Sequence, residues 1–245
     1  MEAAISNHCN LSCEHCSHLS PFMKESFYNL EQFEKDILAL SELVHAGTFH
    51  VLGGEPLLNK RISEYVRVLR ESKICDSITL ITNGLLLPTV KLEDLMIFDN
   101  IDISIYPEIS YDKVYDFIEV NKYRLPTIHY RRYSEFSVQF SKEPLTDAQQ
   151  LDGFMACHCP DRCNYIMNGR YYLCAQSAKA HFAYPWFPAD EGIDIHAPDA
   201  GVALRKLVCG SRVGKRPLRS CRFCNNVQSP RMPHAQKKII PHAVI

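Results

Sequence analysis

The sequence has no long apolar run, no export signal and almost no net charge. Its 245 residues contain no stretch that reaches the roughly 18 apolar positions of a membrane span. No charged segment followed by an apolar one opens the chain, as it does in a signal peptide. A formal net charge of −1 also argues against a nucleic-acid surface. We therefore expect a cytoplasmic protein with no membrane and no nucleic-acid partner.

Cysteine, in contrast, is abundant, with 11 residues. Without an export signal, metal ligation explains these thiols better than a disulfide framework does. Cys9, Cys13 and Cys16 are one ligand short of the four that usually hold an iron–sulfur cluster, so a cubane bound here would leave one iron open to an external ligand. Zinc is the alternative, because a nearby histidine could supply its fourth ligand. The candidates are His8, His15 and His18.

Two strand-like runs each end in small or polar residues. Residues 49–52 lead into Gly53-Gly54-Glu55-Pro56, and residues 78–82 lead into Asn83-Gly84. In parallel α/β proteins, ligands bind at the carboxyl ends of the strands. Glycines allow the backbone to approach a ligand closely, and the side chains of Glu55 and Asn83 can hydrogen-bond an ammonium group. Both segments therefore predict a ligand site.

In this order, the Cys-x3-Cys-x2-Cys, Gly-Gly-Glu-Pro and Thr-Asn-Gly motifs resemble those of radical S-adenosylmethionine (SAM) enzymes. The resemblance implies that Cys9, Cys13 and Cys16 hold a [4Fe–4S] cluster whose open iron chelates SAM. Reduction by a flavodoxin- or ferredoxin-type donor would then cleave SAM to a 5′-deoxyadenosyl radical. It also implies SAM contacts along the strand ends, namely Gly53, Gly54, Glu55, Pro56, Thr82 and Asn83, with Ser104 and His15 as further candidates.

Apolar periodicity predicts alternating strands and helices. Leu30, Phe33, Ile37 and Leu40 recur at helical spacing after Asn29, which is expected to cap the helix, and Gly47 is expected to end it. Alternation of this kind predicts a parallel sheet. We expect an α/β fold with an open partial (β/α) barrel of about six parallel strands, the last near residues 136–140. The barrel would span residues 1–145.

A second group of cysteines predicts a small cysteine-rich C-terminal domain at residues 150–230, followed by a tail at 231–245. Asn168-Gly169 between apolar flanks is a hairpin signal. The layout resembles Twitch, a short form of the SPASM domain that binds an auxiliary [4Fe–4S] cluster. That resemblance implies Cys157, Cys174, Cys221 and Cys224 as ligands. Cys159 and Cys163 are alternatives to Cys157, and zinc would accept the same four thiolates.

The resemblance implies hydrogen abstraction from a small-molecule substrate, a carbinol carbon of a carbohydrate-, aminoglycoside- or nucleoside-like compound. If a thiol returned hydrogen from the opposite face, the product would be an epimer, and Cys159, Cys163 and Cys209 are the candidate donors. If the auxiliary cluster took an electron, the product would be oxidised, as in the alcohol dehydrogenases of aminoglycoside biosynthesis. Of these two outcomes, we favour epimerisation. The alternatives are a peptide-modifying radical SAM enzyme with a separate recognition protein, and a zinc-binding interaction module.

Overall fold

An eight-stranded sheet forms the centre of the computed structural model, which describes residues 1–188, 191–212, 214, 216–225 and 228–236. The strands lie in the order β5-β4-β3-β2-β1-β7-β8-β9, and the first six are parallel. The expected α/β fold with about six parallel strands is thus confirmed. These six are β1 (Glu2–Ser6), β2 (Ala46–Gly53), β3 (Cys75–Thr82), β4 (Asn100–Ile105), β5 (Thr127–Arg132) and β7 (Tyr165–Met167).

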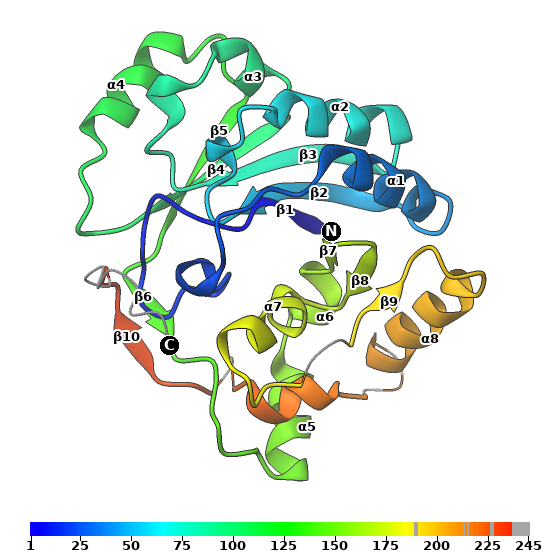
Figure 1. The fold of residues 1–245 in the computed structure, drawn as a ribbon. Coiled ribbons are helices and arrows are strands. Elements are labelled where there is room, and N and C mark those ends of the chain that lie inside the picture. The colour runs from blue at the N-terminus through cyan, green and yellow to red at the C-terminus, as the bar shows by residue number, and fades with distance from the viewer. Residues whose placement is uncertain (189–190, 213, 215, 226–227, 237–245) are drawn as a thin grey trace.

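Helices cover one face of this sheet (Figure 1). They are α1 (Leu30–Ser41), α2 (Ile62–Ser72), α3 (Leu92–Met96) and α4 (Asp112–Asn121). As expected, Asn29 caps α1, its side-chain oxygen accepting the Gln32 N–H at 2.9 Å. Alternate strand residues such as Phe49, Val51 and Ile78 are buried beneath these helices. Gly47 does not end α1, because the helix stops at Ser41 and Gly47 already lies within β2.

The sixth parallel strand is not the segment that the sequence indicated. Near residues 136–140, the structure has β6 (Glu135–Ser137), which pairs antiparallel with β10 (Arg231–Pro233) in a separate two-stranded sheet. Its place beside β1 is taken by β7, all three of whose residues are buried, whereas β6 is half-exposed. A parallel strand covered on both faces needs such burial. The β6 strand, exposed at Glu135 and only partly buried at Phe136 and Ser137, does not supply it.

The hairpin signal is confirmed. β7 turns through Asn168 and Gly169, both with positive φ (49° and 75°), into the antiparallel β8 (Arg170–Tyr172), which pairs with β9 (Ile193–Asp194). Positive φ at both turn residues matches the Asn-Gly preference of tight hairpins. The sheet therefore contains strands from both of the expected domains. Their division remains a prediction.

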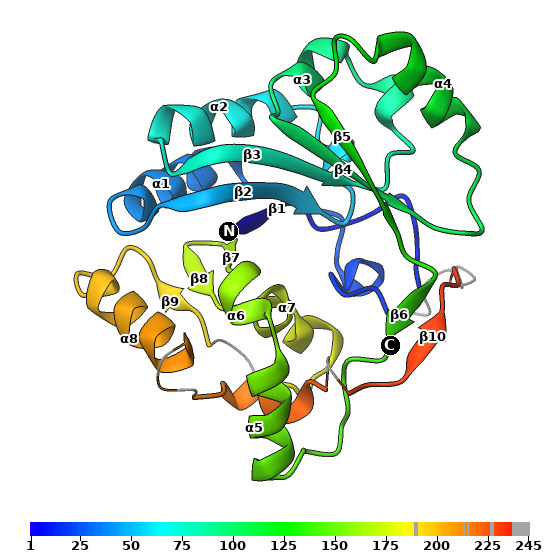
Figure 2. The same cartoon turned by 180° about the vertical axis from the view of Figure 1, so that it is seen from behind.

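The C-terminal half lies against the other face of the sheet (Figure 2). It contains α5 (Asp147–Ala156), α6 (Cys159–Arg162), α7 (Ala175–Ala183), α8 (Ala200–Arg212) and a 3₁₀ turn at Arg219–Phe223. Further 3₁₀ turns lie at Ser20–Phe22, Pro56–Leu58 and Leu87–Thr89. Ala175 and Ala178 of α7 pack against Ala4, Leu52 and Tyr165 of the sheet. In the described part of the chain, no helix combines the length and apolarity needed to cross a bilayer.

Candidate functional site

The first cysteine motif lies in the segment that follows β1, here called the cysteine loop (residues 7–19). It shares a pocket, the rim pocket, with the carboxyl ends of β2, β3 and β4. The pocket is open to solvent and has a cavity volume of about 230 Å³. Its lining includes Cys9, Cys13, Cys16, Gly53, Gly54, Thr82, Asn83 and Ser104. Eight of the expected site residues are thus brought together.

Two of the three thiols, those of Cys9 and Cys13, are shielded from solvent. The Cys9 Sγ accepts the Leu11 N–H at 3.4 Å and the Asn83 side-chain N–H at 3.6 Å. Burial raises the pKa of Cys9 to about 12 and that of Cys13 to about 11. Both are therefore protonated as free thiols at neutral pH, and a bound metal would have to displace their protons.

Gly53 and Gly54 allow the cysteine loop to pass close to the end of β2. A Cβ at Gly53 would lie 2.2 Å from the Ser6 carbonyl oxygen, and one at Gly54 would lie 2.2 Å from that of His8. The Gly54 N–H donates to Ser6 and the Glu55 N–H to His8, at 2.8 and 2.9 Å. The two glycines thus leave room for the backbone of Ser6 and His8, which a side chain at either position would displace.

Glu55 does not line the rim pocket. It is completely buried, and its carboxylate accepts the Thr82 hydroxyl at 2.6 Å and the backbone N–H groups of Asn83 and Leu57 at 2.9 and 3.1 Å. Burial raises the pKa of Glu55 to about 7, although these three donors lower it. Pro56, also buried, is likewise outside the lining. Glu55 therefore positions the β3 end, and Asn83 in turn donates to the Asn10 side chain at 2.6 Å.

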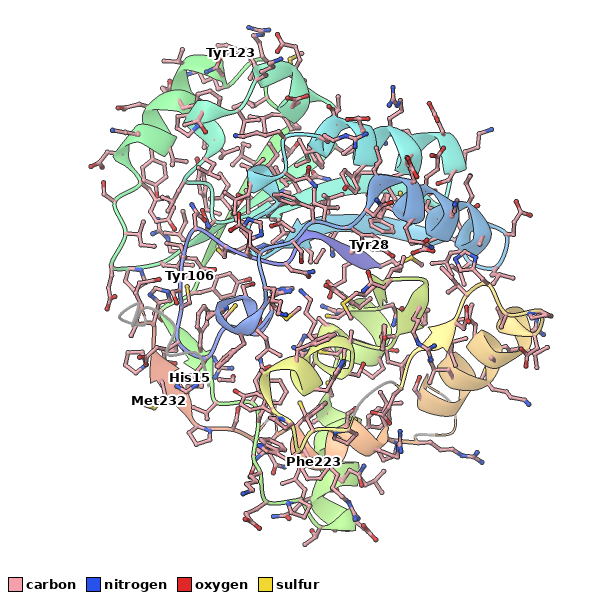
Figure 3. All side chains as sticks on the ribbon, in the orientation of Figure 1. His15, Tyr28, Tyr106, Tyr123, Phe223 and Met232 are labelled. Carbon is pink, nitrogen blue, oxygen red and sulfur yellow. The ribbon has the colours of Figure 1, made fainter. Side chains whose placement is uncertain are left out.

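The two further candidates for SAM contacts, Ser104 and His15, lie in different pockets. Ser104 lines the rim pocket from β4. His15 has a left-handed φ of 55° and faces a neighbouring pocket instead, together with Phe22, Phe140 and Tyr184. In Figure 3, Tyr106 is drawn near the end of the sheet, with His15 farther from it.

The segment around β10 contacts the cysteine loop, although it was expected to be a tail. The Cys13 Sγ lies 3.3 Å from His234 Nε2 and accepts the Gln236 amide at 3.2 Å. His234 also stacks on Tyr106, with ring centroids 4.6 Å apart. None of these residues was expected at the site. The pairing of β10 with β6 brings the segment of His234 and Gln236 close to the site, whereas Tyr106 directly follows β4. No motif in the sequence marked these residues.

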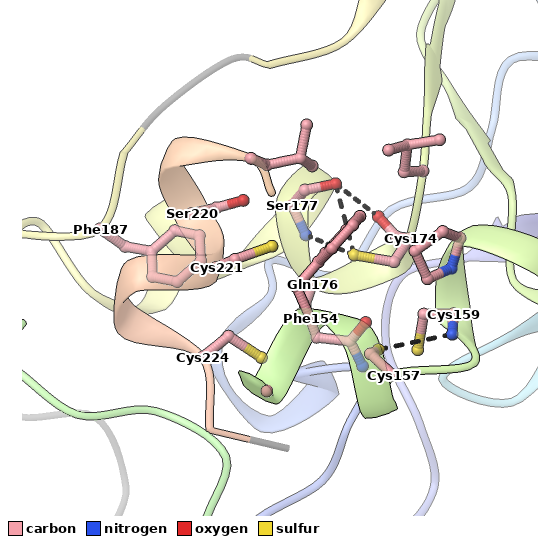
Figure 4. A pocket seen from close by; sticks show the side chains of 14 residues that line it. Phe154, Cys157, Cys159, Cys174, Gln176, Ser177, Phe187, Ser220, Cys221 and Cys224 are labelled. Atoms are coloured by element: carbon pink, nitrogen blue, oxygen red, sulfur yellow. Dashed lines mark hydrogen bonds between the residues drawn. The ribbon is translucent and has the colours of Figure 1, made fainter. Parts of the chain in front are cut away.

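A second pocket, here called the thiol pocket, gathers cysteines from the C-terminal half. Its lining includes Cys157, Cys159, Cys174, Cys221 and Cys224 (Figure 4). Cys174 is the N-cap of α7, and its sulfur accepts the Ser177 N–H at 3.4 Å. Burial nevertheless raises the pKa of Cys174 to about 11, although its hydrogen bonds with Ser177 lower it. Cys221 and Cys224 come from the 3₁₀ turn at Arg219–Phe223 and the residue after it.

The candidate cysteines of the C-terminal half differ in whether they line the thiol pocket. The sulfurs of Cys159 and Cys163 and a ring nitrogen of His158 lie within 4.8 Å of one another, but only Cys159 of these three lines the thiol pocket. A hydrogen bond from Cys159 lowers the pKa of Cys157. Cys209 is exposed on α8 and lines neither pocket. Thus Cys157 and Cys159 both remain candidates for the first ligand.

A family model of the radical SAM superfamily matches residues 4–129, half of the chain. The chain belongs to the radical SAM superfamily. Members of this family use a [4Fe–4S] cluster and SAM and need a reductant. The rim pocket fits that pair, because three cysteine sulfurs and a strip of strand ends share one solvent-accessible space. Cys9, Cys13 and Cys16 would hold the cluster there.

Known relatives resemble parts of the chain. A GTP 3′,8-cyclase from Sulfurovum sp. is 29% identical over 98 residues, 38% of this chain and 30% of that protein. One from Peptoclostridium acidaminophilum is 34% identical over 90 residues, 36% and 27% of the two chains. The match thus spans less than a third of these relatives. Among solved structures, BtrN in complex with AdoMet and 2-DOIA superimposes with a TM-score of 0.56 at 18% identity over 93% of both chains, which shows a shared fold.

Proposed function

We propose that this radical SAM enzyme binds a second [4Fe–4S] cluster and dehydrogenates a carbinol carbon of a small hydroxylated molecule. The observation that carries the proposal is the convergence of Cys157, Cys174, Cys221 and Cys224 on the thiol pocket. Four thiolates complete the coordination of a cubane, an arrangement that resembles the Twitch domain. When bound, SAM and the first cluster would supply the radical that removes the carbinol hydrogen, and the second cluster would take the remaining electron as the hydroxyl proton leaves.

The placement of the spare thiols favours dehydrogenation over epimerisation. An epimerase needs a hydrogen donor beside the substrate radical. Among the described residues, the only thiols lining the rim pocket are Cys9, Cys13 and Cys16, which the first cluster would occupy. Cys159, Cys163 and Cys209 all lie outside that lining. A substrate in the rim pocket would therefore meet no free thiol.

The lining of the rim pocket also favours a neutral, hydroxylated substrate over a nucleoside triphosphate such as that of the GTP cyclases. No arginine or lysine belongs to the described lining, whereas triphosphates are usually held by such cations. The fold is similar to that of BtrN, a protein solved in complex with AdoMet and 2-DOIA, and this similarity also supports a small-molecule substrate.

The test combines metal content with the mass of the product. Protein reconstituted without oxygen should hold roughly eight irons, as two cubanes require. Cys221→Ala should lose about half of the iron, retain SAM cleavage and form no product. In deuterium oxide, the wild-type product should be lighter by two hydrogens and free of solvent deuterium at the reacting carbon. Stoichiometric zinc would refute the cluster, and an inverted carbon carrying one deuterium would establish epimerisation instead.

A further inference from the structure

Residues 231–236, here called the strap, join β6 to the cysteine loop. On one side, the His234 N–H donates to the Ser134 carbonyl at 2.8 Å, next to the pairing of β10 with β6. On the other side, the Glu14 N–H donates to the Ala235 carbonyl, also at 2.8 Å. Backbone hydrogen bonds therefore fix the strap from two directions and hold it against the cysteine motif.

Two side chains of the strap converge on the sulfur of Cys13. His234 Nε2 lies 3.3 Å from this sulfur, and the amide nitrogen of Gln236 lies 3.2 Å from it. The side-chain oxygen of Gln236 accepts the Ser12 N–H at 2.8 Å, which fixes the orientation of the amide group and turns its nitrogen toward Cys13. Two side-chain nitrogens, 221 and 223 positions away in the sequence, thus contact one candidate ligand of the first cluster.

The state of Cys13 determines which of these atoms carry protons. A thiolate that binds iron has only lone pairs to offer, so both neighbouring nitrogens must donate to it. For His234, this assigns the tautomer with its proton on Nε2. The other ring nitrogen, Nδ1, is then an acceptor, and it is buried without a hydrogen-bond partner among the described residues. An unpaired buried N–H at that position would be the costlier alternative.

Aromatic rings hold the His234 imidazole in place. It is 2% exposed and stacks on Tyr106, with ring centroids 4.6 Å apart and ring planes inclined by 11°. It also meets Phe136 edge-on, with centroids 5.3 Å apart and planes inclined by 81°. Tyr106 and Phe136 both line the rim pocket. The imidazole is therefore shielded from water, in surroundings where a hydrogen bond to a charged sulfur is stronger than in solvent.

We propose that His234 and Gln236 are positioning residues for the first cluster, which donate two hydrogen bonds to the Cys13 thiolate, orient it and make the cluster easier to reduce. Reduction adds one electron to the cluster, and N–H donors beside a cluster sulfur stabilise the added charge and raise the reduction potential. Hydrogen bonds of this kind also orient the ligand that they contact. The inference rests on membership of the radical SAM superfamily and needs neither the second cluster nor dehydrogenation.

A redox titration separates hydrogen bonding from packing. Protein is reconstituted without oxygen, and the first cluster is identified as the one whose electron paramagnetic resonance signal changes when SAM is added. His234→Phe keeps a ring against Tyr106 but removes the donor, so the ratio of reduced to oxidised cluster at the wild-type midpoint potential should fall about fivefold or more. His234→Gln, whose amide can replace the Nε2–H group, should restore most of that ratio. His45→Phe is the matched control, because the His45 imidazole is 57% exposed and pairs with Asp76.

Iron retention gives a second measurement. With a chelator present, a variant carrying both His234→Phe and Gln236→Ala should lose the iron of the first cluster about tenfold faster than the wild type, because loss of outer hydrogen-bond partners usually weakens metal binding by about 10- to 100-fold. An unchanged potential in His234→Phe, or an equal fall in His234→Gln, would overturn the proposal and leave only packing. If His234→Phe does not fold, Gln236→Ala decides, and an unchanged potential there overturns the proposal. No substrate is needed, so the result is independent of the product that tests the proposed function.

Discussion

The Asp36 carboxylate accepts the backbone N–H of Gly169 at 2.8 Å, across 133 positions of sequence. Asp36 is completely buried on α1, and Gly169 is the second residue of the β7–β8 turn. The same carboxylate accepts the Gln32 amide at 2.7 Å, lies 2.6 Å from His196 Nε2 and also accepts the Tyr28 hydroxyl. One side chain thus joins the helical layer to the hairpin beside β1.

Asp36→Asn should destabilise the protein by about 2–4 kcal/mol. The amide keeps the size of the side chain but replaces one acceptor oxygen with a donor, which leaves buried donors unsatisfied. Thermal or urea unfolding of the reconstituted protein measures the loss. His196→Ala is the control. It removes one partner whose side chain is 41% exposed, so it should cost about 1 kcal/mol. Equal costs for the two variants would contradict the central role of Asp36.

Gly54→Ala should displace the cysteine loop and weaken SAM binding. The new Cβ would lie 2.2 Å from the His8 carbonyl oxygen and 2.8 Å from the Cys9 nitrogen, so backbone must move. Overpacking of this kind costs about 1–3 kcal/mol. Gly210→Ala is the matched control, since a Cβ there meets nothing within 4 Å and should stabilise α8 by about 0.5–1 kcal/mol. Unchanged SAM affinity in Gly54→Ala would show that the loop adapts without cost.

Cys157→Ala and Cys159→Ala should differ in iron content. We expect Cys157→Ala to lose about half of the iron, because that thiol is the proposed first ligand of the second cluster, and Cys159→Ala to keep nearly all of it. Iron analysis and electron paramagnetic resonance of both reconstituted variants give the answer. The reverse pattern would make Cys159 the ligand. Cys163→Ala serves as the control, since Cys163 does not line the thiol pocket.

Gln236→Ala should make the first cluster harder to reduce. The Gln236 amide donates to the Cys13 sulfur at 3.2 Å, and hydrogen bonds to cluster sulfurs are among the determinants of the reduction potential. Such a bond stabilises the extra negative charge of the reduced state, so its loss should lower the potential. A redox titration followed by electron paramagnetic resonance measures the shift. Gln149→Ala, which removes only a cap of α5, should leave the potential unchanged.

The sequence alone predicted those features that depend on the residues of one short segment. The Cys-x3-Cys-x2-Cys motif and the strand ends at Gly53 and Thr82 predicted a site that the structure assembles at one rim. The cysteine motif follows β1, and Gly53 and Thr82 end the neighbouring strands β2 and β3. The carboxyl ends of parallel strands always lie at the same edge of a sheet, so these residues come together. The same holds for the Asn29 cap and the Asn168-Gly169 turn, since each depends on backbone geometry over a few residues.

Contacts between distant segments were decided only by the tertiary structure. The sixth parallel strand became β7 rather than the run near Phe136, because burial on both faces selects among short apolar segments only after the sheet has formed. Glu55 turned inward to Thr82, although its motif indicated a ligand contact. Gln236 reached Cys13 across 223 positions, and His234 came to stack on Tyr106. Sequence spacing is silent about such pairs, since their proximity results from the packing of whole elements.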